Sequence, residues 1–419
     1  MFNIDNYNIV ALFSIIIVLA FLIIVYLRNK ISSMLDPLMY EIVWLSSNIS
    51  FLIVFSFTKG VNPFAIIFLF SFLLYIVLLN KLLISNKMRY SKKILIHIYT
   101  KKTFLAYMIS VILLIYAKQD VFIYMKDNNF LHWFLYRFVV LQGRDPTLRI
   151  INIGVTPIFL YLSFFYIFLL KKYRIFIFSI LLSYAAILTL TGGRSSLLSI
   201  LLSFGAFLVI HRNIYRKTTL EKINLYSLFF IFLALVFIIG VSTMYRPNYS
   251  YTNGIEIVLN RIIANADGLE YYMKYGGYDH IKSGFLPYIL SFLGIYLKDP
   301  LGIDYKNIGE QLSELAVRHS LSFAQGPNYT LPLQVMVFGY YLYPVYVLAS
   351  SLIVVKMRNM TESTSLSKNI LIFFLISTSF GVVHDLEYFT LKVISFFIVY
   401  MLFFYPILNI NFNFFRKKI

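Results

Sequence analysis

Cysteine is absent from the 419 residues, and charged residues are scarce at 13% of the chain. Without cysteine there is no disulfide framework, no thiol nucleophile and no cysteine-based metal site. Hydrophobic residues make up 60% of the sequence, and the mean hydropathy is +0.78. A soluble core cannot use that much apolar surface, so the sequence predicts a protein whose solvent is the lipid bilayer.

Apolar runs of the roughly 17–25 residues needed to cross a bilayer recur along the chain. They are expected at about 9–27, 39–57, 62–80, 103–117, 150–170, 175–191, 195–211, 225–243, 331–354, 369–383 and 389–409. Residues 1–8 carry no Lys or Arg, so the first run is expected to be a retained span and not a signal peptide. The sequence predicts an all-α, polytopic membrane protein with about 11 transmembrane helices in one domain, 1–419.

Lysine and arginine are concentrated in every second connection between the expected spans. These connections together carry nearly all of the net charge of +19. With the N-terminus outside, the cytoplasmic segments hold 22 of the 37 basic residues but only four of the 18 acidic ones, Asp36, Glu41, Glu221 and Glu362. Positive charge on the cytoplasmic side is what normally orients membrane proteins. The basic excess is therefore assigned to membrane topology and not to a nucleic-acid partner.

Two segments on the outside are too long to be simple connectors, 118–149 and the larger 244–330. Each contains a short apolar stretch, Phe130–Leu141 with Trp133 in the first and Phe285–Leu297 with Pro287 in the second. Such a stretch is typical of a helix lying at the membrane interface. The alternative is a re-entrant or lid-like element over a lipid-linked substrate.

The turn at 191–196 contains Thr-Gly-Gly-Arg-Ser-Ser and is expected to join two spans on the outside. Its Arg194 lies at a helix N-terminus, where the macrodipole disfavours a cation. An anion bound there would satisfy both Arg194 and the free backbone N–H groups. We therefore consider Arg194 a phosphate or pyrophosphate ligand, with contact to lipid headgroups as the alternative.

The long segment 244–330 carries the other candidates for anion binding and proton transfer. Arg246 directly follows a span, and Arg261 comes shortly before Asp267 and Glu270 in the sequence. On continuous helical spacing, the acids share a face with Glu256 and Asn260, with Arg261 beside them. Carboxylates near an arginine are candidates for a general base and an anion clamp. The alternative is a solvated helix with intrahelical ion pairs.

Two histidines on the outside are weaker candidates for proton transfer. His319 follows Arg318, and His384 precedes Asp385 in the short connection 384–388. Adjacent residues on a helix point in different directions, so this proximity alone says little. No metal-ligand spacing, P-loop or G-x-S-x-G motif occurs, and no cofactor is expected.

These features resemble the Wzy-type O-antigen and oligosaccharide repeat-unit polymerases, relatives of the O-antigen ligases. The resemblance rests on the Gly-Gly-Arg-Ser-Ser turn at 192–196 and on the large outside loop with Arg246, Arg261 and Asp267. It also rests on Gly-Pro-Asn at 326–328, which leads into a span with Phe338-Gly339. The chain departs from the ligases at the mouth of that span, where Gly326-Pro327 precedes Asn328 and no His-Asn pair occurs.

The resemblance implies a GT-C-type membrane architecture in the bacterial inner membrane, with an active site facing the periplasm. It implies an inverting, metal-independent transfer of a glycan from undecaprenyl pyrophosphate to a lipid-linked repeat unit in lipopolysaccharide biosynthesis, with a chain-length regulator as a partner. The pyrophosphate ligands would be Arg194, Arg246, Arg261 and Arg318. The catalytic acid or base would come from Asp267, Glu270, His319 and His384.

Two other functions stay open, an O-antigen ligase and a lipid-linked oligosaccharide flippase or other transporter. A ligase uses the same donor and differs in its acceptor. Transporters place ionisable residues within their spans. Here the expected spans hold only Glu41, near an inner end, and Lys392, near an outer one.

Overall fold

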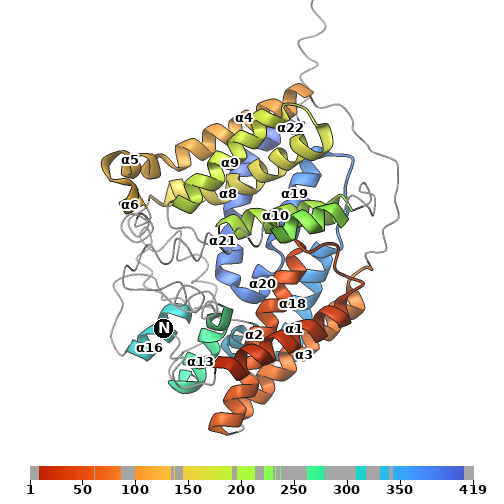
Figure 1. Cartoon of the computed structure of the whole chain (residues 1–419), viewed down its shortest axis with the longest axis vertical. Coiled ribbons are helices and arrows are strands. Elements are labelled where there is room, and N and C mark those ends of the chain that lie inside the picture. Colours follow the sequence, from red (N-terminus) through yellow and green to blue (C-terminus); the bar gives the residue numbers. More distant parts are fainter. Residues whose placement is uncertain are drawn as a thin grey trace, which may run out of the picture. The chain divides into compact units, whose positions relative to one another are not determined.

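In a computed structural model of the chain, every element is helical within the residues that it describes. These residues are 9–60, 62–85, 100–133, 136, 145–190, 196–212, 221–229, 232, 236, 262–277, 281, 308–317, 331–338 and 343–409. The elements, labelled in Figure 1 where there is room, are α1 (Ile9–Leu27), α2 (Pro37–Lys59), α3 (Pro63–Leu82), α4 (Thr100–Ala117), α5 (Gln119–Asp127), α6 (Phe130–Trp133), α8 (Pro146–Phe164), η3 (Phe165–Leu170), α9 (Arg174–Leu190), α10 (Ser196–Ile210), η4 (Ala264–Ala266), α13 (Asp267–Lys274), α16 (Ile308–Val317), α17 (Leu331–Phe338), α18 (Tyr343–Arg358), α19 (Leu366–Thr378), α20 (Gly381–His384), α21 (Leu386–Val399), η6 (Tyr400–Phe404) and α22 (Tyr405–Asn409).

Six helical stretches in the described ranges are long and apolar enough to cross a membrane. They are Val10–Leu27, Pro37–Lys59, Pro63–Leu82, Pro146–Leu170, Leu366–His384 and Leu386–Asn409. A seventh is possible if α4 and α5, which are bent by 49°, form one span. Six or seven such stretches, in a chain whose described elements are all helical, agree with the predicted polytopic membrane protein.

The expectation of about eleven spans is met only in part. The six long stretches and α4 correspond to seven of the expected runs. Helices α9 and α10 coincide with the runs 175–191 and 195–211, but at 17 and 15 residues they lie at or below the lower limit of about 17 residues for crossing a bilayer. The run 331–354 is described as two helices, α17 and α18, and 339–342 between them lie outside the described residues. Most of the run 225–243 also lies outside them. The count of eleven therefore stays a prediction.

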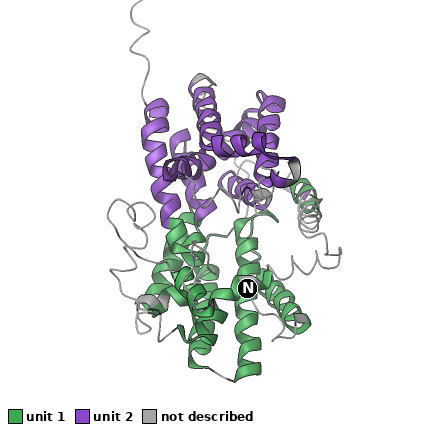
Figure 2. Cartoon of the chain, turned by 90° about the vertical axis from the view of Figure 1, so that its left-hand side faces the viewer, with its two compact units in different colours: residues 1–87, 222–359, 379–389 green, residues 88–221, 360–378, 390–419 purple. Residues whose placement is uncertain are grey.

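The chain divides into two compact units, coloured separately in Figure 2. Unit 1 contains residues 1–87, 222–359 and 379–389, and unit 2 contains residues 88–221, 360–378 and 390–419. Each unit is assembled from segments far apart in the sequence, because helices bury their apolar faces against whichever segments return beside them.

Helix α2 is the buried centre of unit 1, in contact with α1, α3 and η4. It starts cleanly because Pro37 occupies the first turn and the Asp36 side chain accepts the N–H of Leu38 at 2.9 Å. Its interior is unusually polar for a span, with four buried side chains that could each hydrogen-bond, Ser46, Ser47, Asn48 and Ser50. Ser46, Ser47 and Asn48 donate to backbone carbonyls one turn earlier, which satisfies those donors within the helix.

The connections that carry basic residues gather at one end of unit 1, which we call the basic end. Lys30 donates to the carbonyl of Leu83, and Asn359 Nδ2 donates to the carbonyl of Leu82 at 3.1 Å. Asn359 Oδ1 in turn accepts the N–H of Ile84 at 2.9 Å. The ends of α1, α3 and α18 and the start of α2 therefore lie together, as an alternating path through a membrane requires.

Unit 2 has an aromatic core built by α4, α8, α10, α19 and α21. The Phe374 and Phe396 rings stack with centroids 4.0 Å apart, and Tyr161 contacts the rings of Phe207 and Phe373. At Gly154, α8 comes so close to α21 that an added Cβ would lie 2.4 Å from the carbonyl oxygen of Ser395. Only a glycine permits that approach, a familiar device at helix contacts in membranes.

Replacing Gly154 with alanine should destabilise unit 2, because the new methyl group meets backbone that cannot rotate away. Overpacking of this kind costs about 1–3 kcal/mol. The measurement is the thermal unfolding midpoint of the purified protein in detergent. Ser179→Ala, on the exposed face of α9, is the control and should leave the midpoint unchanged. An equal midpoint for both variants would contradict this packing.

Replacing Arg358 with methionine should destabilise unit 1, because it leaves the buried Asp36 carboxylate without its cation. Removing one partner of a buried ion pair costs about 3–5 kcal/mol. Lys356→Met, at an exposed position on the same last turns of α18, is the matched control. The unfolding midpoint should fall for Arg358→Met alone, and equal behaviour of the two variants would show that the ion pair contributes nothing.

Candidate functional site

The structure describes three of the eight residues expected to form the site, Asp267, Glu270 and His384. The other five, His319 and the arginines at 194, 246, 261 and 318, lie outside the described residues. The apolar stretch Phe285–Leu297 also lies outside them, and of Phe130–Leu141 the structure describes α6 and Tyr136. Trp133 in α6 donates its indole N–H to the carbonyls of Met125 and Asn128, both at 2.9 Å.

The two described acids of the long segment lie on α13, one turn apart. Glu270 is buried, with 1% of its surface exposed, and Asp267 is half-buried. Lys274, one turn after Glu270, brings its ammonium nitrogen to 3.8 Å from a Glu270 carboxylate oxygen. A carboxylate held out of water beside a lysine is chemically suited to accept a proton.

The structure corrects the expectation that one helical face, on continuous spacing, carries the polar residues between 256 and 270. A 3₁₀ turn, Ala264–Ala266, precedes α13, so a face drawn with continuous α-helical spacing does not carry through from residue 256 to Asp267. Asp267 and Glu270 still share a face, because they lie three residues apart within α13. Glu256, Asn260 and Arg261 lie outside the described residues.

The pKa of Tyr271 reflects the electrostatics around α13. Burial, together with the negative charges of Asp267 and Glu270 and the neighbouring Tyr275, raises the pKa of Tyr271 to about 12. A phenol with this pKa stays protonated at neutral pH and can donate a hydrogen bond. The surface around α13 is therefore acidic, and any phosphate near it requires cations from elsewhere in the chain.

One stripe of side chains on α3 shows at which end of unit 1 helix α13 lies. Phe64 and Phe68, in the first turns of α3, contact the ring of Tyr272 with centroids 6.3 and 6.0 Å apart. Phe72, one turn further, contacts the ring of Trp44 edge-on at 6.0 Å. The stripe continues to Tyr75 and ends near Leu82 at the basic end. Helix α13 therefore lies against the end of α3 that is opposite the basic end.

His384 does not join α13. Its Nε2 atom pairs with Glu41 in the second turn of α2, and its ring stacks on Trp44 with centroids 3.9 Å apart. Both partners lie near the basic end, since Asp36 is only five residues before Glu41. The sequence predicts His384 on the outside and Glu41 near the inner end of a span. This separation is wrong, because the two side chains are in contact. The sequence neighbour Asp385 instead caps α21 by accepting the N–H of Tyr388 at 2.8 Å.

A second buried pair lies beside this one. Arg358, at the end of α18, donates Nη2–H to Asp36 Oδ1 at 2.6 Å, and both side chains are almost fully buried. The guanidinium also lies over the Phe380 ring, 5.6 Å from its centroid. Tyr75, from α3, interacts electrostatically with both Glu41 and Arg358. The two pairs, the Trp44 ring stacked on His384 and Tyr75 form what we call the α2 polar cluster: Asp36, Glu41, Trp44, Tyr75, Arg358 and His384.

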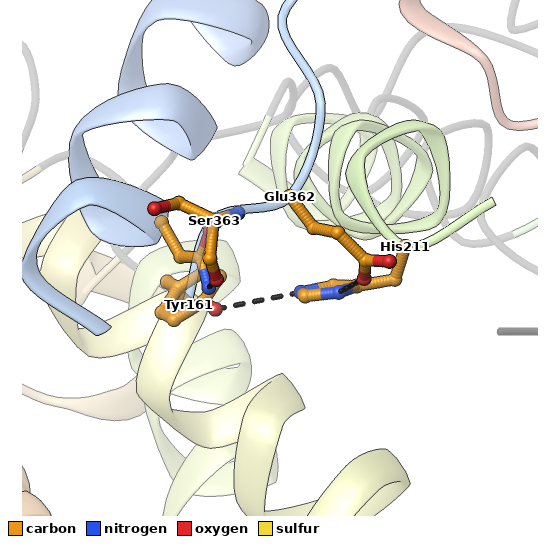
Figure 3. A network of polar contacts seen from close by, with 5 residues as sticks. Tyr161, His211, Glu362 and Ser363 are labelled. Atoms are coloured by element: carbon orange, nitrogen blue, oxygen red, sulfur yellow. Dashed lines mark hydrogen bonds and ion pairs between the residues drawn. The ribbon is translucent and has the colours of Figure 1, made fainter. Parts of the chain in front are cut away.

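Unit 2 has its own histidine network, drawn in Figure 3. His211, the first residue after α10, lies between Tyr161 Oη at 3.4 Å and Glu362 Oε2 at 3.3 Å. Glu362 belongs to the connection before α19, which Asn369 holds by accepting the N–H of Ser363 at 2.6 Å. This network ties two connections that the charge pattern assigns to the cytoplasm, and its simplest role is to hold them together.

Sequence reasoning missed the α2 polar cluster, although part of the signal was visible. Glu41 stood out as an acid inside an apolar run, and such residues in membrane helices usually have a partner. Which partner it has depends on the return of α18 and α20 beside α2, about 320 to 340 residues later. The described residues contain no group of three or more His, Cys, Asp or Glu side chains that could hold a metal ion.

Comparisons with known proteins add nothing to this geometry. No family of known sequences, no curated protein and no solved structure matches the chain. What the protein does must therefore be argued from its own residues.

Cysteine labelling should show that the two ends of unit 1 face opposite sides of the membrane, and the natural chain has no cysteine to interfere. We expect Lys59→Cys, at the exposed end of α2, to react in intact cells with a maleimide that cannot cross the inner membrane. Ser85→Cys, exposed at the basic end, should react only after permeabilisation. Reaction of both positions from the same side would contradict the alternation of spans.

Proposed function

We propose that the protein is an oligosaccharide repeat-unit polymerase of the bacterial inner membrane. It transfers a growing glycan from undecaprenyl pyrophosphate to a new lipid-linked repeat unit at the periplasmic face. The observation that carries the proposal is the buried carboxylate of Glu270 on α13, at the end of unit 1 opposite the basic end. The resemblance in the loop around it and the all-helical, apolar architecture support the same reaction.

The proposed chemistry needs one base and several cations. The acceptor hydroxyl oxygen attacks the anomeric carbon of the donor sugar, the bond to pyrophosphate breaks, and the configuration inverts. Glu270 takes the hydroxyl proton, and Asp267 and Lys274 adjust its charge. Arg194, Arg246, Arg261 and Arg318 stabilise the negative charge that develops on the departing pyrophosphate.

The acidity of the surface around α13 fits this division of labour. Asp267 and Glu270 repel a pyrophosphate, so α13 is suited to the acceptor side of the reaction and the arginines to the donor side. A base that is buried also avoids bulk water, which would otherwise compete with the sugar hydroxyl as the nucleophile. With His384 paired to Glu41 near the basic end, the described candidates for the base reduce to Asp267 and Glu270.

Glu270→Gln should reduce polymer formation by about 10²–10⁴-fold, the usual contribution of a general base. Cells deleted for the gene are complemented with wild type or variants, and the surface polysaccharide is resolved on a gel. Glu221→Gln makes the same chemical change at an exposed position and is the control. Full-length polymer in cells with a stably expressed Glu270→Gln protein would exclude Glu270 as the base.

The same gel tests the arginines and separates the proposal from its alternatives. Alanine at Arg194, Arg246 or Arg261 should abolish polymer, and lysine should not restore it fully where two hydrogen bonds to phosphate are needed. A deletion that leaves lipid A-core capped with a single repeat unit identifies a polymerase. Uncapped core with accumulating lipid-linked polymer identifies a ligase.

The α2 polar cluster is the observation that favours a second candidate, a flippase or other transporter. Transporters bury ionisable residues within their spans, and α2 carries Glu41 inside a helix long enough to span. This candidate predicts loss of even the single capped unit in the deletion strain, with repeat units retained at the inner leaflet. That outcome would overturn the polymerase proposal.

A further inference from the structure

The connection between η3 and α9 is a strongly basic turn at the end of unit 2 that the charge pattern assigns to the cytoplasm. Residues 171–174, with the sequence Lys-Lys-Tyr-Arg, follow the π-helix η3 and begin α9, and all four are exposed. We call them the 171–174 turn. Three positive charges lie here within four residues, and the proposed glycosyl transfer uses none of them.

The backbone of the 171–174 turn has an unusual conformation. Among the described residues other than glycine, only Lys171 and Tyr173 have a positive φ, at 56° and 53°. A residue with a Cβ atom adopts this left-handed conformation at an energetic cost, and glycine is the usual residue where a helix ends in it. Arg174 closes the turn, because its Nε–H donates to the carbonyl of Ile167 in η3 at 2.7 Å. The turn is therefore a defined structure that carries its cations at set positions of the backbone.

Tyr173 joins the turn to the first turns of α4. Its ring contacts the ring of Phe104 with centroids 5.4 Å apart, and the Lys172 ammonium nitrogen lies 5.4 Å from the centroid of the Tyr173 ring. Phe104 follows Lys101 and Lys102 closely in α4. The starts of α4 and α9 thus bring five basic residues to the same end of unit 2.

The helices that surround the turn supply no acid to its cations. Helices α4, α8, η3, α9 and α22 pack against one another in unit 2, and their sequences contain neither Asp nor Glu. The N-terminus of α9 adds to the positive charge, because the first N–H groups of a helix form the positive end of its dipole. Cations in such a place are stabilised by an anion that comes from outside these helices.

An exposed apolar stripe, which we call the α9 stripe, runs along α9 directly from the turn. It consists of Ile175, Phe178 and Leu182, which are 86%, 54% and 60% exposed and which share one face of the helix by their spacing. Its two ends lie about 10 Å apart along the helix axis. A ligand that binds here meets positive charge at one end and an apolar surface beyond it. This combination fits a lipid with an anionic headgroup better than it fits a free phosphate ion.

We propose that the 171–174 turn binds the phosphate headgroup of an anionic phospholipid of the cytoplasmic leaflet, with an acyl chain along the α9 stripe. Arg174 suits a phosphate, because the guanidinium donors that remain beside its Nε–H can form two parallel hydrogen bonds to phosphate oxygens. Lys171 and Lys172 strengthen the attraction, since basic residues beside a span favour anionic over zwitterionic headgroups. The site is independent of the proposed function, because none of its residues takes part in glycosyl transfer.

Quenching by brominated lipids measures which lipid occupies the α9 stripe. Ser179 follows Phe178 on the exposed surface of α9, and Ser179→Cys gives a single position for a bimane label because the natural chain has no cysteine. The labelled full-length protein is reconstituted in phosphatidylcholine vesicles that contain a small fraction of either brominated phosphatidylglycerol or brominated phosphatidylcholine. Phosphatidylglycerol should bind about five-fold more strongly or better, the contribution of one cation close to an anionic headgroup.

Replacing the three cations tests whether the turn is responsible. Lys171→Gln, Lys172→Gln and Arg174→Gln together should abolish the preference for phosphatidylglycerol. Lys172→Gln alone should lower the preference in part, and it preserves the test if the triple variant does not assemble. A bimane at Val18→Cys, on the exposed face of α1, should show no preference, since α1 contains no charged residue.

A second triple variant separates a local site from the overall charge of the cytoplasmic side. Arg28→Gln, Lys81→Gln and Lys356→Gln remove the same number of exposed cations from unit 1. These substitutions should leave the preference at the Ser179→Cys label intact, because the proposed site uses only charges of unit 2.

Three results would overturn the proposal. Equal quenching by the two brominated lipids, with the three cations in place, would show that the turn does not select an anion. An equal loss of preference in both triple variants would show a diffuse surface charge and no site. Loss of the preference in sodium phosphate, at an ionic strength where sodium chloride preserves it, would assign the turn to a free phosphate ion. None of these readouts needs transfer activity, so the polysaccharide gel tests the polymerase proposal separately.

Discussion

Two carboxylates at the start of one buried helix, Asp36 and Glu41, must find partners, and unit 1 is arranged around that requirement. A lone buried carboxylate is far more costly than any single apolar contact is favourable. Arg358 and His384 meet the requirement from α18 and α20, elements more than 300 residues away in the chain. The position of these elements beside α2 then determines how α3 and the connections of the basic end assemble.

The same arrangement separates two kinds of chemistry along α3. Its first turns carry phenylalanines that hold α13 and thereby Glu270, and its later turns carry Tyr75 beside Glu41 and Arg358. A carboxylate that accepts a proton from a substrate and a carboxylate held in a buried pair require different surroundings. Glu270 has a half-exposed lysine beside it, whereas Glu41 has a stacked histidine and a buried tyrosine. Distance along a rigid helix keeps the two from perturbing each other.

Unit 2 depends on apolar packing to a greater degree. Its helices meet through stacked aromatic rings and through the close approach at Gly154. In lipid, association of helices gains little from the hydrophobic effect, so close packing and a few hydrogen bonds must supply specificity. The His211 network adds such hydrogen bonds at the connection between α18 and α19.

The sequence by itself determined the helical class, the membrane as solvent and the positions of most long spans. Hydropathy and charge act locally, and each span satisfies its own backbone hydrogen bonds. The sequence also singled out Asp267 and Glu270, because acids in a long polar segment between apolar runs are conspicuous. Their shared face within α13 followed from helical spacing, whereas the 3₁₀ turn before α13 did not, since no residue type requires it.

Only the tertiary structure decided which distant groups meet. The partner of His384 is Glu41 and not the adjacent Asp385, because side-chain partners are set by how helices return beside one another and not by sequence proximity. The burial of Glu270 and the stacking of Trp44 on His384 were decided in the same way. Burial and charge pairing are properties of the assembled helices. The sequence therefore predicts the helices but not the contacts between them.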